Sequence, residues 1–188
     1  MIYLDNSATT RVLPEAADAA CRAMTEQFYN PASAYQPAVA TEKAVGEARA
    51  RLSSALGFTA EELLYTSGGT ESNNMAILGS LKPKRGKRRI LTTLGEHPSV
   101  YEVFRSLEND AETEVVFIGL NADGTANLEQ LAALLTADTA LVSLMHVNNE
   151  VGAVSDLAAA AALIRRLSPD VLLHSDGVQA FCKQPFVR

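Results

Sequence analysis

The residues with the clearest chemical potential form one short turn, Ser67-Gly68-Gly69-Thr70, between an apolar segment and a helical pattern. Adjacent glycines permit positive φ angles and a close approach of the backbone to a ligand. Thr70 can cap the helix, and the first N–H groups of a helix favour an anion such as phosphate. The same turn also suits a purely structural strand-to-helix connection, so on its own it leaves both interpretations open.

Polar, chemically capable residues follow further apolar segments of the chain. They are Gly95-Glu96-His97 after residues 89–93, His146-Val147-Asn148-Asn149-Glu150 after residues 140–145, and Ser175-Asp176-Gly177-Val178-Gln179 after residues 171–174. Residues 114–118 instead end in the unremarkable run Gly119-Leu120-Asn121. Ligands of open α/β sheets lie outside the carboxyl ends of the strands. The pattern therefore predicts one shared ligand pocket.

The side chains in these segments indicate a particular ligand. Asp176, at the end of a buried strand, needs a cationic partner, which a protonated ring nitrogen would provide. His97 offers a flat ring for stacking, and Asn149 and Gln179 can donate to a phenolic oxygen. Together with a phosphate at the glycine turn, these groups describe pyridoxal 5′-phosphate, in which an Asp facing the pyridinium makes the ring an electron sink. The alternative for Asp176 is a cap on the turn that follows it.

Strand and helix patterns alternate along the chain, which positions these segments. Strands are predicted at residues 63–66, 89–93, 114–118, 140–145 and 171–174, and helices at residues 14–28, 38–56, 71–81, 98–107, 128–135 and 156–167. Such alternation is typical of βαβ units, and continuous apolar strands are typical of parallel sheets. The predicted fold class is α/β, a mostly parallel sheet with helices on both faces.

Composition excludes several classes of protein. The 188 residues, 47% of them hydrophobic, predict one domain with a sizeable core. A net charge of −6 argues against general nucleic-acid binding, and the basic residues 82–89 are interpreted as a connecting loop. Cys21 and Cys182 lack metal-binding spacing and favour a reducing compartment. No signal peptide or membrane-spanning segment is recognised, so the cytoplasm is expected. His146 and His174 are interpreted as structural histidines.

Several segments, in the same order along the chain, resemble one enzyme family. They are Leu4-Asp5-Asn6-Ser7-Ala8-Thr9-Thr10, Asn30-Pro31-Ala32-Ser33, Thr66-Ser67-Gly68-Gly69-Thr70-Glu71-Ser72-Asn73-Asn74, Glu96-His97, Met145-His146-Val147-Asn148-Asn149-Glu150-Val151-Gly152 and Asp176-Gly177-Val178-Gln179. The sequence resembles the cysteine desulfurases of the fold-type I, class V aminotransferase superfamily. Within them it is most similar to the group of the nitrogenase and housekeeping iron–sulfur enzymes.

The resemblance implies a role for each candidate residue. Gly69 and Thr70 would hold the phosphate of the cofactor, pyridoxal 5′-phosphate, through backbone N–H groups and the hydroxyl. The catalytic residues would be His97, stacked on the ring and able to assist proton transfer, and Asp176, paired with the pyridinium nitrogen. Asn149 and Gln179 would bind near the ring hydroxyl. No metal is implied.

The resemblance also implies a reaction and partners. Family members convert L-cysteine to L-alanine, and a mobile cysteine takes the sulfur as a persulfide for a sulfur-acceptor protein, often in iron–sulfur cluster biogenesis. They form homodimers. Two alternatives stay open: another class V enzyme that acts on a different amino acid, and a shortened, non-catalytic binding or assembly module.

Two features depart from the family pattern. The Schiff-base lysine and the mobile cysteine of the family lie downstream of the matched region. Lys183 does not match the lysine, and Cys21 and Cys182 do not match the cysteine. We therefore expect an N-terminal segment (residues 1–13), a truncated large cofactor domain (residues 14–188), no small C-terminal domain, and no turnover by this chain alone. In addition, Ala34-Tyr35-Gln36 stands where the family often has a histidine.

Overall fold

The computed structural model describes residues 2–81 and 88–184. Residue contacts divide the described chain into two compact units, residues 2–65 and residues 66–184. The division predicted at residue 13 stays a prediction, and residues 82–87 of the basic run lie outside the described residues. Among the helices that the structure describes, none is both long and apolar enough to cross a membrane.

The first unit is helical. It contains α1 (Pro14–Glu26), α2 (Gln36–Ala55) and the short 3-10 helix η1 (Ala60–Glu62). A proline in the first turn begins both α-helices, where its missing N–H group costs nothing. The two predicted helices are therefore confirmed, with ends that differ by up to two residues.

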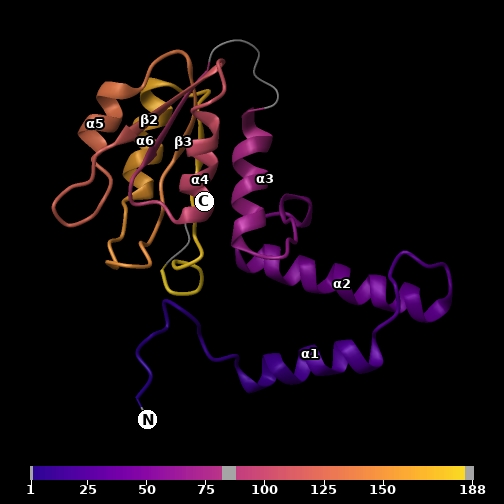
Figure 1. Ribbon diagram of the computed structural model, residues 1–188. Helices are drawn as coiled ribbons and strands as arrows, with labels where there is room; N and C mark the ends of the chain where they lie inside the picture. The colour runs from indigo at the N-terminus through magenta and orange to yellow at the C-terminus, as the bar shows by residue number, and fades with distance from the viewer. Residues whose placement is uncertain (1, 82–87, 185–188) are drawn as a thin grey trace. The chain divides into compact units, whose positions relative to one another are not determined.

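The second unit is built on a parallel sheet (Figure 1). Its strands are β1 (Arg88–Thr93), β2 (Thr113–Ile118), β3 (Thr139–Ser143) and β4 (Leu172–His174), hydrogen-bonded in the order β2-β1-β3-β4. All three pairings are parallel. The predicted α/β class with a parallel sheet is confirmed.

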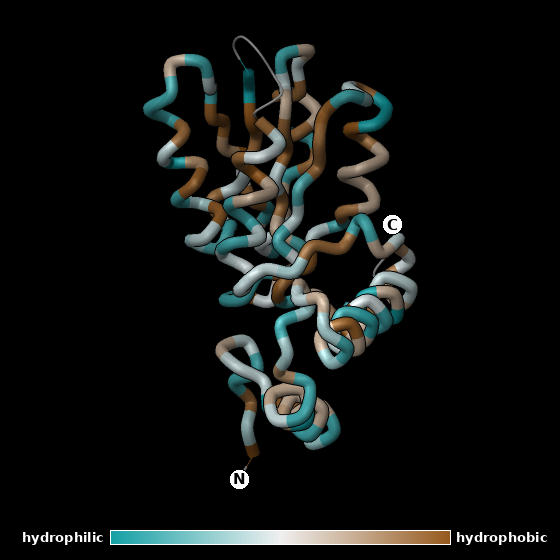
Figure 2. The backbone as a smooth tube through the Cα atoms, turned by 90° about the vertical axis from the view of Figure 1, so that its right-hand side faces the viewer, coloured by the Kyte–Doolittle hydropathy of each residue, from teal (hydrophilic) through white to brown (hydrophobic). Residues whose placement is uncertain are grey.

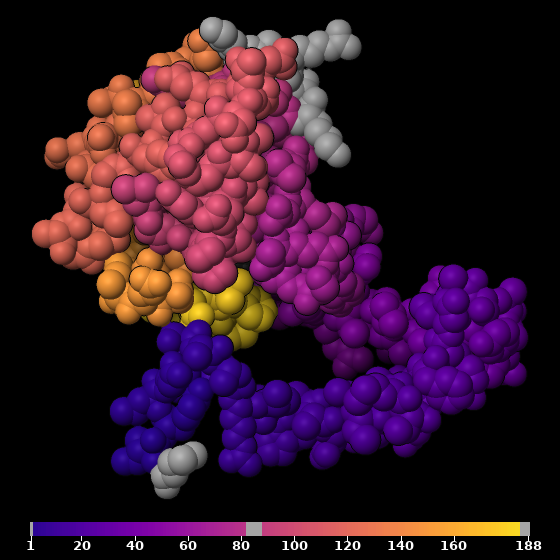
Figure 3. Space-filling model, viewed as in Figure 1, coloured from indigo at the N-terminus to yellow at the C-terminus, as the bar shows by residue number. Residues whose placement is uncertain are grey.

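Helices cover both faces of this sheet. Helices α3 (Gly69–Leu81) and α4 (Pro98–Leu107) lie side by side in the space-filling view (Figure 3). They share a core cluster with Ile90, whereas α5 (Leu128–Leu134) and α6 (Leu157–Leu167) share another with Leu91. Because successive strand residues point to opposite faces, β1 supplies both clusters. Hydrophobic stretches accordingly run along the strands (Figure 2).

The strand order creates a crevice at one point of the sheet. From β1 the chain passes through α4 to β2 on one side, and from β3 it passes through α6 to β4 on the other side. The loops that leave β1 and β3 therefore diverge at the carboxyl edge. Such a reversal of direction is the position at which open α/β sheets bind ligands.

The strand predicted at residues 63–66 is wrong. These residues have no regular secondary structure, and Leu64 and Tyr65 are 65% and 49% exposed. An apolar run becomes a strand only when another strand pairs with it, and no described strand does so. Helix α3 also begins at Gly69, so Thr70 lies within its first turn and not at its cap.

The first residue of α3 packs closely on the segment that follows β4. A Cβ atom at Gly69 would lie 2.8 Å from Cγ2 of Val178, which is closer than carbon atoms normally approach. Gly79, in the same helix, faces open space. The close packing at Gly69 therefore requires a residue without a side chain. A side chain at Gly79 would meet no such clash.

We expect Gly69→Ala and Val178→Ala to be coupled in their effects on the free energy of unfolding. Removing the valine methyl groups relieves the clash, so the coupling should be at least about 0.5 kcal/mol. Gly79→Ala is the control: it should stabilise by about 0.5–1 kcal/mol through helix propensity and show no coupling to Val178→Ala. Urea denaturation measures both cycles, and additivity of the Gly69 pair would contradict the expectation.

Candidate functional site

A pocket of about 270 Å³ lies at the crevice between the loops that follow β1 and β3. Its lining comes from those two loops and the start of α4: Leu94, Gly95, Glu96, His97, Pro98, Tyr101, Asn148, Asn149 and Glu150. The structure thus brings His97 and Asn149, two of the predicted site residues, into one pocket.

His97 caps α4 and holds its ring in a fixed orientation. Its Nδ1 accepts from the backbone N–H of Ser99 at 3.1 Å and lies 2.8 Å from the Ser99 hydroxyl oxygen. Because Nδ1 accepts, the proton of the neutral ring is on Nε2. The exposed imidazole therefore presents an N–H group on its outer edge.

A chain of hydrogen bonds connects His97 to Asp176 across the unit. The side-chain amide of Asn73, on α3, donates to Ser99 Oγ at 2.9 Å and to Asp176 Oδ2 at 2.8 Å. Ser99 Oγ in turn donates to His97 Nδ1 at 2.8 Å. An amide donates both protons without passing one along, so this network fixes positions and does not conduct protons. Sequence reasoning missed Asn73 and Ser99.

Asp176 is a buried carboxylate just after the end of β4. It is 3% exposed, and no ion pair to it occurs among the residues that the structure describes. Its Oδ1 accepts from the backbone N–H of Val178 at 2.9 Å, in addition to the bond from Asn73 to Oδ2. The turn-capping role considered for Asp176 is therefore present, and a buried negative charge remains that a cation would stabilise.

Two further side chains hold the walls of the pocket together. Glu96 Oε1 accepts from the backbone N–H of Met145 at 2.6 Å, and Asn148 Nδ2 donates to the carbonyl oxygen of Gly95 at 2.9 Å. Burial, with a smaller effect from the charge of Asp176, raises the pKa of Glu96 to about 8. Sequence reasoning did not select Glu96, although a glutamate at the end of a buried strand was a signal for it.

The phosphate-binding candidates begin α3. Gly69 and Thr70 lie one turn before Asn73, so Gly69 and Asn73 share the helix face that meets the segment after β4. The backbone N–H and hydroxyl of Ser67 both donate to Glu71 Oε2 at 2.6 Å, which lowers the pKa of that carboxyl. A negative charge in the first turn of a helix is favourable.

The remaining predicted residues lie apart from the pocket lining. Gln179 accepts from Lys183 Nζ at 2.9 Å, in the turn after β4. The structural interpretation of His174 is confirmed: its Nδ1 lies 2.8 Å from Ser143 Oγ, and burial lowers its pKa while Asp176 opposes that shift. Cys21, Cys182 and Lys183 are exposed.

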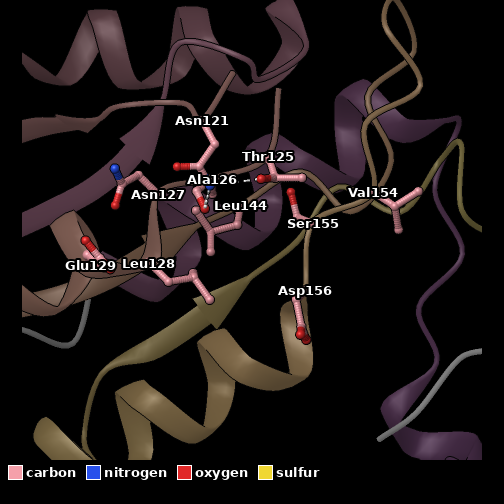
Figure 4. Close-up of a pocket in the computed structure, with 10 residues that line it drawn as sticks. All are labelled: Asn121, Thr125, Ala126, Asn127, Leu128, Glu129, Leu144, Val154, Ser155 and Asp156. Carbon is pink, nitrogen blue, oxygen red and sulfur yellow. Dashed lines mark hydrogen bonds between the residues drawn. The ribbon is translucent and has the colours of Figure 1, made fainter. Parts of the chain in front are cut away.

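A larger pocket, of about 410 Å³, lies elsewhere on the second unit (Figure 4). Its polar side chains stabilise local turns: Asn121 donates to Thr125 Oγ1 at 3.0 Å, and Asp156 caps α6 through the N–H of Ala159 at 2.9 Å. Its lining includes no predicted site residue. Size alone therefore does not identify the functional site.

Known sequences match the chain over nearly its whole length. The family model "Aminotransferase class-V" matches residues 2–187. The cysteine desulfurase of Trichormus azollae is 38% identical over 185 residues, covering 98% of this chain and 46% of that protein. The cysteine desulfurase IscS of Aeromonas salmonicida is 42% identical over 188 residues, covering 98% and 46%. The chain thus spans about half the length of these curated relatives.

Solved structures share its fold. A NifS-like protein superposes with a TM-score of 0.90 and 32% identity, covering 95% of this chain and 49% of that one. SspA, solved in complex with cysteine, gives a TM-score of 0.89 and 29% identity, covering 96% and 52%. Since the family model covers far more than half of its residues, this chain belongs to the class V aminotransferase family.

Proposed function

We propose that residues 1–188 form the cofactor-binding part of a pyridoxal-phosphate-dependent cysteine desulfurase. The observation that carries the proposal is the buried carboxylate of Asp176, which has two hydrogen-bond donors and no cation among the described residues. A protonated ring nitrogen would neutralise it. Relatives that carry the name cysteine desulfurase at 38–42% identity support the choice of reaction.

The residues present fit that cofactor. Asp176 would pair with the ring nitrogen, His97 would lie against the ring, and the first N–H groups of α3 at Gly69 and Thr70 would receive the phosphate. Asn149 and Gln179 would bind near the ring hydroxyl. When bound, pyridoxal 5′-phosphate supplies an electron sink, and the charge of Asp176 maintains it.

His97 is the candidate for moving a proton. Ser99 donates to Nδ1 through its N–H and hydroxyl, which keeps the exchangeable proton of the neutral ring at Nε2. Imidazole is the side chain that most often serves in general acid–base catalysis, so Nε2 suits that role. Asn73 and Ser99 would hold the imidazole ring of His97 and the carboxylate of Asp176 in a fixed relative position.

We also propose the substrate, the sulfur acceptor, the cellular location and the oligomeric state. The substrate would be L-cysteine, the product L-alanine, and the sulfur would leave as a persulfide for an acceptor protein, in iron–sulfur cluster biogenesis. The catalytic lysine and the mobile cysteine would lie outside residues 1–188, so these residues by themselves would be inactive. The protein would act in the cytoplasm as a homodimer.

The complete protein that contains residues 1–188 tests the function directly. With pyridoxal 5′-phosphate it should become coloured, and with L-cysteine and a reductant it should release alanine and sulfide in equal amounts. A coloured protein that acts on another amino acid would replace the substrate. A protein that stays colourless would overturn the cofactor assignment.

We expect Asp176→Asn to lower kcat/KM for cysteine by about 10²-fold or more, because the ring nitrogen loses its charged partner. Asp170→Asn is the control: Asp170 is exposed and precedes β4, so its activity should stay within about twofold of the original. Steady-state alanine release measures both variants. Equal activity of the two would exclude Asp176 from the site.

Asn73→Ala should lower the free energy of unfolding by about 1–3 kcal/mol, because Asp176 then loses a donor in a buried environment. Asn74→Ala is the matched control, since within the described residues the Asn74 side chain donates locally, to the carbonyl oxygen of Thr70 at 2.8 Å. Its cost should be about 0.5 kcal/mol. Urea unfolding compares the two neighbours, and similar costs would argue against the network.

A further inference from the structure

Glu96 joins the two loops that carry the pocket. Its Oε1 accepts from Met145 N–H, in the loop after β3, while Asn148 of that loop donates to Gly95 O, in the loop after β1. Each loop thus sends one side chain to the backbone of the other. The residues that follow these two, His97 and Asn149, line the pocket together with them. The paired bonds therefore set the separation of its walls.

The hydrogen bonds also indicate where the negative charge resides. Asp176 receives two donors, whereas Glu96 receives one, and Glu96 Oε2 is buried without a hydrogen-bond partner in the described part of the chain. Glu96 is 7% exposed. When two nearby carboxyl groups are buried, the one with more donors keeps the charge and the other takes a proton.

The titratable groups around Glu96 favour the same distribution of charge. Besides Asp176, the titratable groups in this region are His97, Tyr101 and Glu150, which line the same pocket, His146, which follows Met145, and His174, which interacts with Asp176. No Lys or Arg lines the pocket among the described residues. Burial and the charge of Asp176 both raise the pKa of Glu96, to about 8. At neutral pH the group is therefore mostly a carboxylic acid.

We propose that Glu96 is a positioning residue, a neutral carboxylic acid that joins the His97 loop to the Asn149 loop and leaves the buried negative charge on Asp176. The part that concerns the cofactor ring rests on the proposed function. The part that concerns the neutral, loop-joining state does not. Separate experiments on the complete protein test the neutral, loop-joining state and the link to the cofactor ring.

The conservative variant distinguishes this role from that of a needed charge. In Glu96→Gln the amide oxygen still accepts from Met145 N–H, and the side chain is neutral at every pH. Glu96→Ala removes the acceptor and leaves Met145 N–H buried without a partner. Glutamine should therefore replace glutamate, and alanine should not. Glu102→Gln, at an exposed position of α4, is the control.

The first measurement needs no cofactor. A folded-state pKa above the unfolded value of 4.5 gives stability that is fully present below pH 4.5 and lost as the pH rises to about 8. The folded-to-unfolded ratio of the original protein, relative to Glu96→Gln, should therefore fall by up to about tenfold per pH unit in this window. Glu102→Gln should keep the slope of the original. A Glu96→Gln slope equal to the original would overturn the neutral state.

The second measurement reads the position of His97. The ring signals of His97 can be assigned in NMR spectra of the complete protein by comparison with a substitution of that residue. Glu96→Ala should shift them, whereas Glu96→Gln should leave them in place. If Glu96→Ala does not fold, the glutamine variant still decides, since displaced His97 signals in it would contradict the proposal. Unchanged signals in a folded alanine variant would also contradict it.

Titration with pyridoxal 5′-phosphate, followed by its visible absorbance, tests the link to the ring. The dissociation constant should rise about tenfold or more in Glu96→Ala and stay within about threefold in Glu96→Gln. Weak binding by the glutamine variant would mean that the charge of Glu96 is required. Absence of binding by the original protein would overturn the proposed function, and the first two measurements would still decide the neutral, loop-joining state.

Discussion

The buried negative charge of Asp176 is the constraint on which the rest of the site depends. An unpaired carboxylate in a protein interior is costly, so elements from different parts of the chain must supply donors to it. Asn73 comes from α3, and the N–H of Val178 comes from the turn after β4. The side-chain amide of Asn73 also donates to Ser99, which in turn bonds His97. One charge thus orders the start of α4, one face of α3 and the end of β4.

The sheet makes this arrangement possible. Parallel strands place their carboxyl ends on one edge, and the order β2-β1-β3-β4 makes the loops after β1 and β3 diverge there. A pocket opens between them, while the first turns of α3 lie at the same end of the sheet and bring Asn73 to Asp176. The larger pocket beside Asn121 and Asp156 is lined by none of the predicted site residues, and its polar groups serve local turns.

Local sequence patterns predicted much of the fold and of the site. They did not predict the roles that depend on contacts between distant parts of the chain. Pro98 after His97 predicted α4 over residues 98–107, which are its observed bounds. The polar strand ends predicted a pocket that holds His97 and Asn149. Residues 63–66 failed as a strand because strand formation requires a partner from elsewhere. Asn73, Ser99 and Glu96 escaped notice because their roles come from contacts with residues 26 to 103 positions away.

Neighbouring residues in the loops after β1 and β3 have two different roles: one positions the loop, and the other is available to contact a ligand. The lining residues Glu96, His97, Asn148 and Asn149 all come from these loops, but only Glu96 and Asn148 bond the backbone of the opposite loop among the bonds described for them. A residue that only positions its neighbour then looks, in sequence, like a residue that performs chemistry. Burial and hydrogen-bond partners distinguish the two: Glu96 is buried and accepts from the N–H of Met145 in the opposite loop, whereas His97 is exposed and its Nδ1 bonds Ser99 at the start of its own helix.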